Sequence, residues 1–284
     1  MFLSAAPSGA GQETPAPQAA PTLPATPESS DGSPDSADAV SLDLAKHHFY
    51  NARFETSVDV TRLLETNQPD DLAIHEMRSS ALLFQLKRLL EPRGKKVPLK
   101  ECASCPALIA KFAADFQHAR TLARARVAAA PDDVEARFFL GKLNLNYIWL
   151  QLGPLGKKTG WNEYWEGRRS LDEVLAARPD HVRARIGRAW IDYIVDTRMP
   201  WGTEWMLGGG DRKRALRVVR EAAASEQVEY YAHVEAEFAL WEMLIKERDL
   251  VSATDVARRL SRDFPDNKDI AAFLETRTAD TRPD

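Results

Sequence analysis

A Pro-Asp step recurs along the chain, and it constrains the fold more than any other feature. It occurs at Pro69, Pro131, Pro179 and Pro265, each followed directly by aspartate. Proline suits the first turn of a helix, where its missing N–H is not needed. An acidic side chain there suits the positive end of the helix dipole. Each step therefore predicts that one helix ends and the next begins.

Side-chain size keeps a fixed register relative to these prolines. Fifteen residues before each proline stands a large residue: Phe54, Phe116, Tyr164 and Leu250. Twelve residues before it stands a small one: Ser57, Ala119, Gly167 and Ala253. Ten residues after the first three prolines the residue is small again: Ser79, Gly141 and Ala189. Small positions let two helix backbones approach and large ones fill the remaining space, so the register predicts packed helix pairs.

This register resembles the tetratricopeptide repeat (TPR) family. The family unit is a 34-residue helix-turn-helix with small residues at fixed points on both helices and a closing proline. Leu140-Gly141 falls where the family places its Leu-Gly pair. The resemblance covers roughly residues 40–275 and implies an all-α fold, a solenoid of helical hairpins.

The spacing departs from the family in one respect. The prolines lie 62, 48 and 86 residues apart, so the extra residues must form long connections within hairpins. We place these connections at 91–105, 153–162 and 199–210. A further unit lacks the step, and its second helix is expected to begin near Asp211, after three glycines. The sequence therefore predicts about five hairpins with three enlarged loops.

Composition divides the chain into three segments. Residues 1–38 are rich in Pro, Ala and Ser and are expected to be a disordered tether, residues 39–276 the repeat domain, and residues 277–284 a disordered tail. The first six residues are apolar but lack the basic start and full apolar stretch of a secretory signal. A tether of this composition commonly follows a cleaved leader, so we expect a periplasmic or secreted protein, with the cytoplasm as the alternative.

Charge and hydropathy argue against a nucleic-acid partner and against a transmembrane segment. Charged residues make up 28% of the chain and the net charge is -4, without the basic excess typical of nucleic-acid binders. No apolar run approaches the roughly 18 residues that a membrane-spanning helix needs. We therefore predict no nucleic-acid partner and no transmembrane segment.

The residue types that carry catalysis or bind metals form no convincing motif. Cys102 and Cys105 make a lone C-x-x-C without a thioredoxin-like βαβ setting, and Pro106 replaces the histidine that haem attachment needs. A zinc site would need a second ligand pair. We favour a loop disulfide or two unreactive thiols, with a thiol-redox helper as the less favoured interpretation. The six histidines share no metal-binding spacing, so we predict no enzyme, no metal and no cofactor.

Aromatic residues gather in the central part of the chain. They are Trp149, Trp161, Tyr164, Trp165, Trp190, Tyr193, Trp201 and Trp205. Polar residues are interleaved with them: Asn144, Asn146, Arg168, Asp192 and Asp196. The favoured interpretation is a core in which the long loops fold back over the repeats. The alternative is a pocket lined by aromatic side chains and a few polar groups.

The TPR resemblance also implies a binding surface. In that family the first helix of each hairpin lines a concave groove, and ligand contacts come from set positions on it. The corresponding positions here are Glu76, Ser80, Phe84, Phe138, Lys142, Asn146, Arg183, Trp190 and Tyr193. Aromatic anchors and both charge signs suit an extended peptide or a small polar-aromatic ligand. We therefore predict a non-catalytic scaffold for a protein or peptide partner.

A second resemblance supplies the alternative function. The run at 207–216, Leu-Gly-Gly-Gly-Asp-Arg-Lys-Arg-Ala-Leu, and the enlarged loops are similar to the periplasmic T-component of TRAP-type transporters. That component is also built from TPR-like hairpins. The similarity implies a periplasmic helical protein that binds a small solute.

Overall fold

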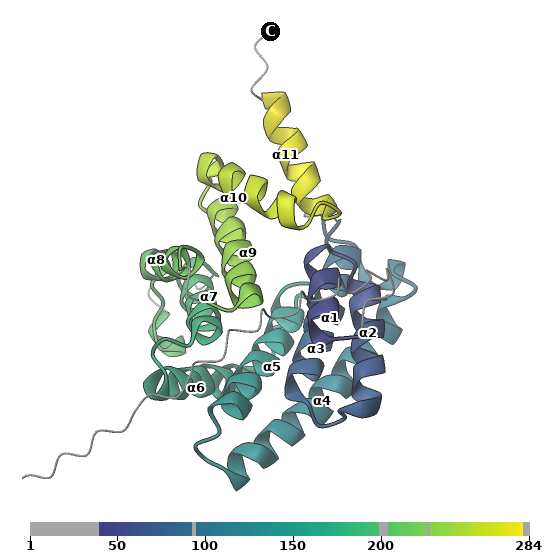
Figure 1. The fold of residues 1–284 in the computed structure, drawn as a ribbon, viewed down its shortest axis with the longest axis vertical. Helices are drawn as coiled ribbons and strands as arrows, with labels where there is room; N and C mark the ends of the chain where they lie inside the picture. The colour runs from purple at the N-terminus through teal and green to yellow at the C-terminus, as the bar shows by residue number, and fades with distance from the viewer. Residues whose placement is uncertain (1–39, 93–94, 199–203, 226–227, 281–284) are drawn as a thin grey trace, which may run out of the picture. The chain divides into compact units, whose positions relative to one another are not determined.

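The computed structural model describes residues 40–92, 95–198, 204–225 and 228–280, so the predicted tether at 1–38 lies outside the described residues. Within these ranges the chain forms eleven α-helices and no strand (Figure 1). The helices are α1 (Leu42–Tyr50), α2 (Phe54–Asn67), α3 (Leu72–Leu90), α4 (Cys105–Ala129), α5 (Val134–Leu152), α6 (Trp161–Ala177), α7 (Val182–Arg198), α8 (Arg212–Ala223), α9 (Tyr230–Lys246), α10 (Leu250–Asp263) and α11 (Lys268–Asp280). The predicted all-α array of helical hairpins is confirmed.

The helices pair in chain order. The hairpins are α1–α2, α3–α4, α5–α6, α7–α8 and α9–α10, and α11 follows the last of them. Three Pro-Asp steps lie in the short turns that join one hairpin to the next, and the fourth, at Pro265, joins the last hairpin to α11. The prolines precede the helices instead of occupying their first turns, because the following residues cap them: the side chain of Asp71 accepts from Ala73 N, and that of Asp133 from Ala136 N.

The small positions of the register are where helices touch. A Cβ added to Gly167 of α6 would stand 3.1 Å from the Cβ of Asn144 and 3.3 Å from the carbonyl oxygen of Gly141, both on α5. Ala119 and Ala253 are fully buried. The large position fills the space alongside, as with Phe116, which is 1% exposed. Alternation of size therefore sets how closely the helices approach.

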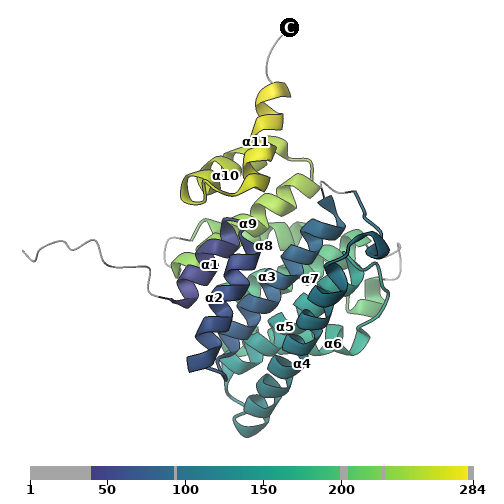
Figure 2. The same cartoon turned by 90° about the vertical axis from the view of Figure 1, so that its right-hand side faces the viewer.

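The first helices of the hairpins form a layer in which α3 packs on α5 and α7 on α9. The N-terminal hairpin also reaches the C-terminal helices, as Figure 2 shows for α1 beside α9. Asn267 donates its side-chain amide to the carbonyl of Tyr50 at 2.7 Å. Arg53 pairs with Asp266 at 2.6 Å and Arg88 with Asp269 at 2.9 Å. These contacts join residues about two hundred positions apart.

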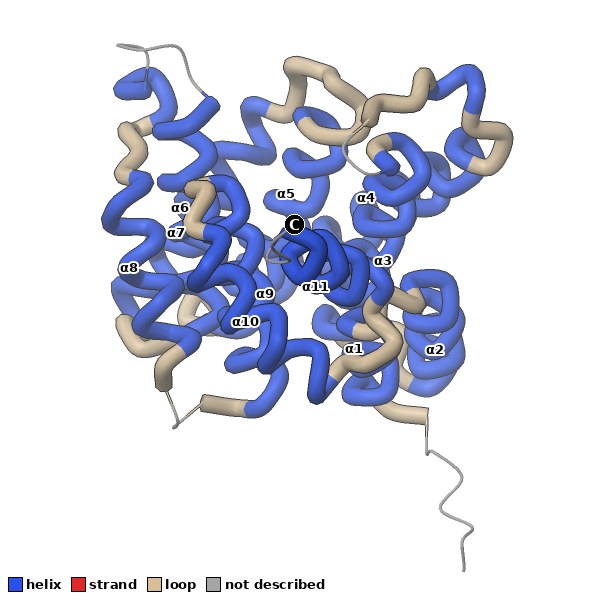
Figure 3. The backbone as a smooth tube through the Cα atoms, turned by 90° about the horizontal axis from the view of Figure 1, so that it is seen from above, coloured by secondary structure: helices blue, strands red, loops and turns tan. Residues whose placement is uncertain are grey.

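Two of the three enlarged loops occur where predicted, between α3 and α4 and between α5 and α6. The third joins α7 to α8; its residues 199–203 lie outside the described residues, and the rest contains a short 3-10 helix, η3 (Glu204–Leu207). Because each loop joins the first helix of a hairpin to the second, all three lie along one edge, the upper edge in Figure 3. We call the residues 91–92, 95–104, 153–160 and 204–211 the loop edge.

The C-terminal boundary differs from the prediction. Helix α11 continues to Asp280, so the first four residues of the predicted tail, 277–284, are helical. Arg277 in its last turn suits the negative end of the helix dipole, and Thr278 donates its hydroxyl to Leu274 O at 2.6 Å. Residues 281–284 lie outside the described residues.

Candidate functional site

Four first helices bring four charged side chains together. Glu76 comes from α3, Lys142 from α5, Arg183 from α7 and Glu235 from α9. Arg183 donates to Glu235 at 2.6 Å and to Glu76 at 3.0 Å. Lys142 donates to Glu235 at 2.7 Å and lies 4.0 Å from Glu76. We call these four residues the charge network, and the face of α3, α5, α7 and α9 that carries it the inner face.

The ionisation of the network follows from its pairing. Burial alone would raise the pKa of Glu235, but the charges of Lys142 and Arg183 and their hydrogen bonds outweigh it and lower that pKa to about 2. Burial acts in the opposite sense on Arg183, where the two carboxylates overcome it and raise the guanidinium pKa. Both groups are therefore fully charged at neutral pH.

Polar and aromatic neighbours complete the site. Ser80 donates its hydroxyl to Glu76 at 2.8 Å. The side-chain amide of Asn146 donates to the hydroxyl of Ser80 at 2.9 Å. The guanidinium of Arg183 lies over the ring of Phe138, 5.0 Å from its centre. The structure thus brings together six of the nine predicted residues.

The other three predicted residues lie elsewhere. Phe84 packs against the rings of Phe49 and Phe54, from α1 and α2. Tyr193 is 2% exposed and donates its hydroxyl to Glu247 at 2.8 Å. Trp190 is half-buried and meets Tyr193 edge to face. The rings of Phe84 and Tyr193 belong to helix packing around the site, whereas Trp190 packs beside Tyr193 and keeps part of its ring accessible.

Accessibility is uneven among the residues that converge. Phe138 is 1% exposed, Glu76 4% and Asn146 5%. The side chains of Lys142 and Arg183 keep 15% and 25% of their surface exposed. The carboxylates of Glu76 and Glu235 already hold the two cations, so an incoming group would have to compete with them.

Sequence reasoning missed two members of this region. Glu235 lies on α9, whose hairpin lacks the Pro-Asp step at its start, so no register reached it. Tyr50 ends α1, and its ring packs against Tyr231 and Phe238 of α9. Burial, and then the charge of Glu235, raise the pKa of Tyr50 well above its ordinary value. In the sequence, the one local indication of this region is that Tyr231 and Glu235 stand four positions apart, which places them on the same face of a helix.

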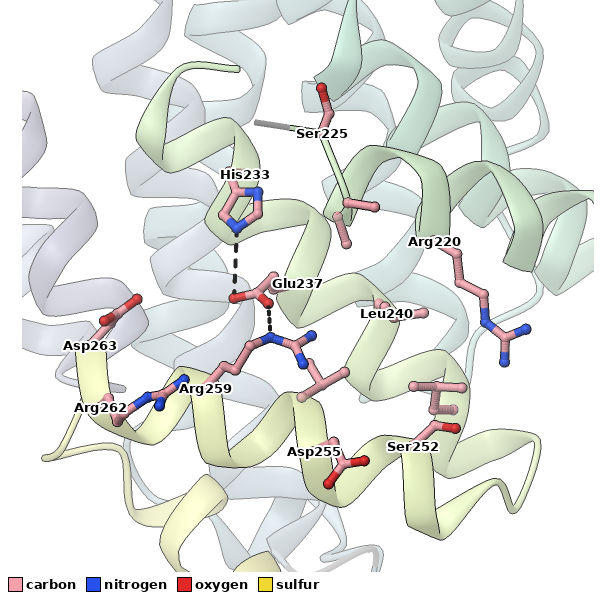
Figure 4. A pocket seen from close by; sticks show the side chains of 14 residues that line it. Arg220, Ser225, His233, Glu237, Leu240, Ser252, Asp255, Arg259, Arg262 and Asp263 are labelled. Carbon is pink, nitrogen blue, oxygen red and sulfur yellow. Dashed lines mark hydrogen bonds and ion pairs between the residues drawn. The ribbon is translucent and has the colours of Figure 1, made fainter. Parts of the chain in front are cut away.

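A separate cleft of about 790 Å³ lies between α8, α9 and α10 (Figure 4). Its buried carboxylate, Glu237, accepts from Arg259 at 2.7 Å, and His233 lies 3.9 Å away on its other side. Leu240 and Val256 contribute apolar lining. None of the nine predicted residues lines this cleft.

Cys102 and Cys105 form a disulfide at the start of α4, with Cα atoms 5.4 Å apart. Cys105 is fully buried and Cys102 half-buried against the same hydrophobic cluster. No group of three or more His, Cys, Asp or Glu suited to holding a metal occurs in the part of the chain that the structure describes. None of the described helices combines the length and apolar composition that crossing a bilayer requires.

The central aromatic residues that the structure describes differ in burial. Tyr164 and Tyr193 are buried, Trp149 and Trp190 are half-buried, and Trp161 and Trp165 are exposed. Trp201 and the side chain of Trp205 lie outside what the structure describes.

One predicted polar partner of the aromatic residues holds the third loop. Arg168 on α6 donates to the carbonyls of Leu207 at 2.9 Å and Gly208 at 2.8 Å. Tyr164 donates to the same Leu207 carbonyl at 2.8 Å. Helix α8 begins directly after this loop, near Asp211 as predicted, and the side chain of Asp211 caps it by accepting from Arg214 N.

Replacing Arg168 should loosen this loop. In Arg168→Met the carbonyls of Leu207 and Gly208 lose their charged donor, and we expect a loss of about 2 kcal/mol in the free energy of unfolding. Hydrogen exchange should quicken at residues 208–214 more than elsewhere. Arg169→Met, an exposed neighbour, is the control. Unchanged exchange in the loop of Arg168→Met would contradict the role given to this guanidinium.

Comparison with known proteins adds little to this geometry. No protein-family model matches the chain, and no curated protein matches it either. Among solved structures, the thermophilic TPR protein TTC0263 of Thermus thermophilus is similar at 13% identity, covering 83% of this chain and 95% of that one, with a TM-score of 0.46. This likeness is too distant to support an argument, and the hairpin arrangement rests on the helix contacts described above.

Proposed function

We propose that the chain is a non-catalytic helical-repeat scaffold that binds a protein or peptide partner through its inner face. One observation carries the proposal: four successive hairpins each contribute one charged side chain to a single network, and three of these stay partly exposed, Arg183 at 25% and Lys142 and Glu235 at 15% each. Side chains held this way are oriented before a partner arrives, which lowers the entropic cost of binding.

The most exposed member of the network is the cation Arg183, which favours a partner segment that carries carboxylates. Such a group would pair with Lys142 and Arg183 in place of Glu76 or Glu235, exchanging one set of charge-assisted hydrogen bonds for another. Trp190 lies two turns along α7 from Arg183, on the same side of the helix, and offers a half-buried ring for an apolar side chain beside the carboxylate.

The ionisation of the site favours holding a ligand over proton transfer. A general acid or base works best with a pKa near the operating pH. Pairing instead lowers the pKa of Glu235 to about 2 and raises that of Arg183. Neither group exchanges a proton readily at neutral pH, which supports a non-catalytic role.

Photo-crosslinking at defined positions tests the proposal. A photoreactive residue in place of Trp190 should capture a partner protein in cells, whereas one in place of Arg217, which is 68% exposed on α8, should not capture it. The partner identified in this way is then tested in a pull-down without crosslinking. There, Lys142→Met combined with Trp190→Ala should lower its recovery by roughly tenfold or more. Circular dichroism and a thermal melt confirm that the variants are folded. Equal capture from both positions, or full recovery with the double variant, would exclude the inner face as the binding surface.

A further inference from the structure

Large apolar side chains stand exposed beside the loop edge. Trp161 is 57% exposed and Trp165 is 39% exposed, and the two lie one turn apart on α6. Leu152, at the end of α5, is 47% exposed, and Met206 in η3 is 58% exposed. Single exposed apolar residues are common, but two tryptophans on one helix face point to a surface with a partner.

Exposed lysines lie in the loops next to Leu152 and Trp161. They are Lys95, Lys96, Lys100, Lys157 and Lys158, all exposed, from the first two enlarged loops. Lys96 lies 3.9 Å from Glu91, a long and exposed pair. Within the first two loops the described residues thus carry five lysines against two carboxylates, Glu91 and Glu101, in a chain whose net charge is -4.

The chain contacts place the lysines and the apolar side chains together. The backbone N–H of Lys157 donates to the carbonyl of Gln151 at 2.7 Å, which holds this lysine beside Leu152. The ammonium of Lys96 stands 3.8 Å from the position that a Cβ on Gly156 would take, so the first loop touches the second. Trp161 begins α6 three residues after Lys158.

Packing and hydrogen bonds to the underlying helices also hold the loop edge in place. Leu155 packs into the hydrophobic cluster shared by α3 and α4. Tyr164 and Arg168 bind the carbonyl of Leu207, which fixes the backbone next to Met206. The exposed side chains therefore project from an ordered surface.

We propose that this edge docks onto an anionic phospholipid bilayer. Tryptophan prefers the interfacial region of a membrane, where its ring is partly buried and its N–H remains hydrated. Lysines next to it are attracted by anionic headgroups, and each lysine raises the membrane-binding constant by about tenfold at most. Apolar side chains and lysines in one surface are the combination by which peripheral proteins lie on membranes.

The same composition argues against a protein partner for this edge. Lysine is depleted from protein interfaces, where Tyr and Arg are favoured instead. Here the basic residues in the described parts of the first two loops are lysines, with aliphatic chains that place the charge at headgroup level while the stems cover apolar surface. The membrane proposal is independent of the inner face, which lies on the helix layer instead of the loops.

Vesicle cosedimentation of the full chain tests the proposal. The chain should sediment with vesicles of phosphatidylcholine and phosphatidylglycerol in equal parts, much less with phosphatidylcholine alone, and less as salt rises. Trp161→Ser and Lys158→Glu should each lower the binding constant by roughly tenfold. Both side chains are exposed, so folding should be unaffected.

Matched substitutions away from the edge serve as controls. Tyr230→Ser removes an aromatic ring that is 52% exposed on α9, and Lys268→Glu reverses an exposed charge at the start of α11. Neither should change sedimentation. The proposal is overturned if the chain binds anionic and neutral vesicles equally, or if the edge variants bind vesicles as the parent does. It is also overturned if the chain binds no vesicle but binds a purified protein or RNA in a manner that depends on Trp161 and Lys158.

Discussion

Glu235→Gln should lower the free energy of unfolding by about 3 kcal/mol at neutral pH, because the substitution keeps the shape of the side chain and removes the charge that holds Lys142 and Arg183. The magnitude follows from the pKa of Glu235, which pairing lowers from 4.5 to about 2. Its side chain is 15% exposed, so solvent screens the pairing only in part. Chemical denaturation at neutral pH measures the loss.

The same variant has a defined pH dependence. A carboxylate whose pKa is lower in the folded chain stabilises it fully above the ordinary value of 4.5, and that stabilisation is lost as the pH falls toward about 2. The difference in unfolding free energy between parent and Glu235→Gln should therefore be largest at neutral pH and shrink through this window. Parent and variant should converge at its acidic end.

An exposed glutamate supplies the control for this experiment. Glu275→Gln on α11 removes a carboxylate from an exposed position and should change stability by less than about 0.5 kcal/mol. If Glu235→Gln matched Glu275→Gln at every pH, the charge network would make no net contribution. Solvated ion pairs contribute little to stability, so this comparison can contradict the prediction.

The parts of this fold that sequence predicted are those decided by local chemistry. A Pro-Asp-Asp turn ends one helix and caps the next wherever it occurs, and small residues at fixed offsets mark the helix contacts, as at Gly141 and Gly167. The positions of the first two enlarged loops followed from the extra length between successive prolines. None of these inferences needed knowledge of residues far away in the chain.

The site itself was predicted only in part, because it depends on distant pairing. Glu76 and Arg183 meet across 107 positions, and their contact depends on the rotation that accumulates over two hairpins. Phe84 lies two turns after Glu76, yet α1 and α2 cover that end of α3, so its ring enters the packing of the first hairpin. The register along α3 predicted which residues share one face of the helix, but it could not predict which neighbouring helix covers that face.

Gly141→Val should be the most damaging substitution at a helix crossing. A Cβ at this position would stand 2.9 Å from the Cγ and Cδ2 atoms of Leu171 on α6, closer than any relaxed contact allows. Leu171 is fully buried, and its other methyl group already lies 3.1 Å from where a Cβ on Gly187 of α7 would be. The leucine therefore lies between two glycines in a buried position.

We expect this substitution to cost about 3 kcal/mol, at the upper end for an overpacked core. Ala176→Val on the exposed face of α6 measures the cost of valine in a helix alone, which should be about 0.6 kcal/mol. Shortening the leucine should relieve the clash, so Gly141→Ala with Leu171→Val should be more stable than the sum of the two single changes predicts. Strict additivity in that cycle would mean that α5 and α6 move apart freely, and that glycine at 141 does not set their spacing.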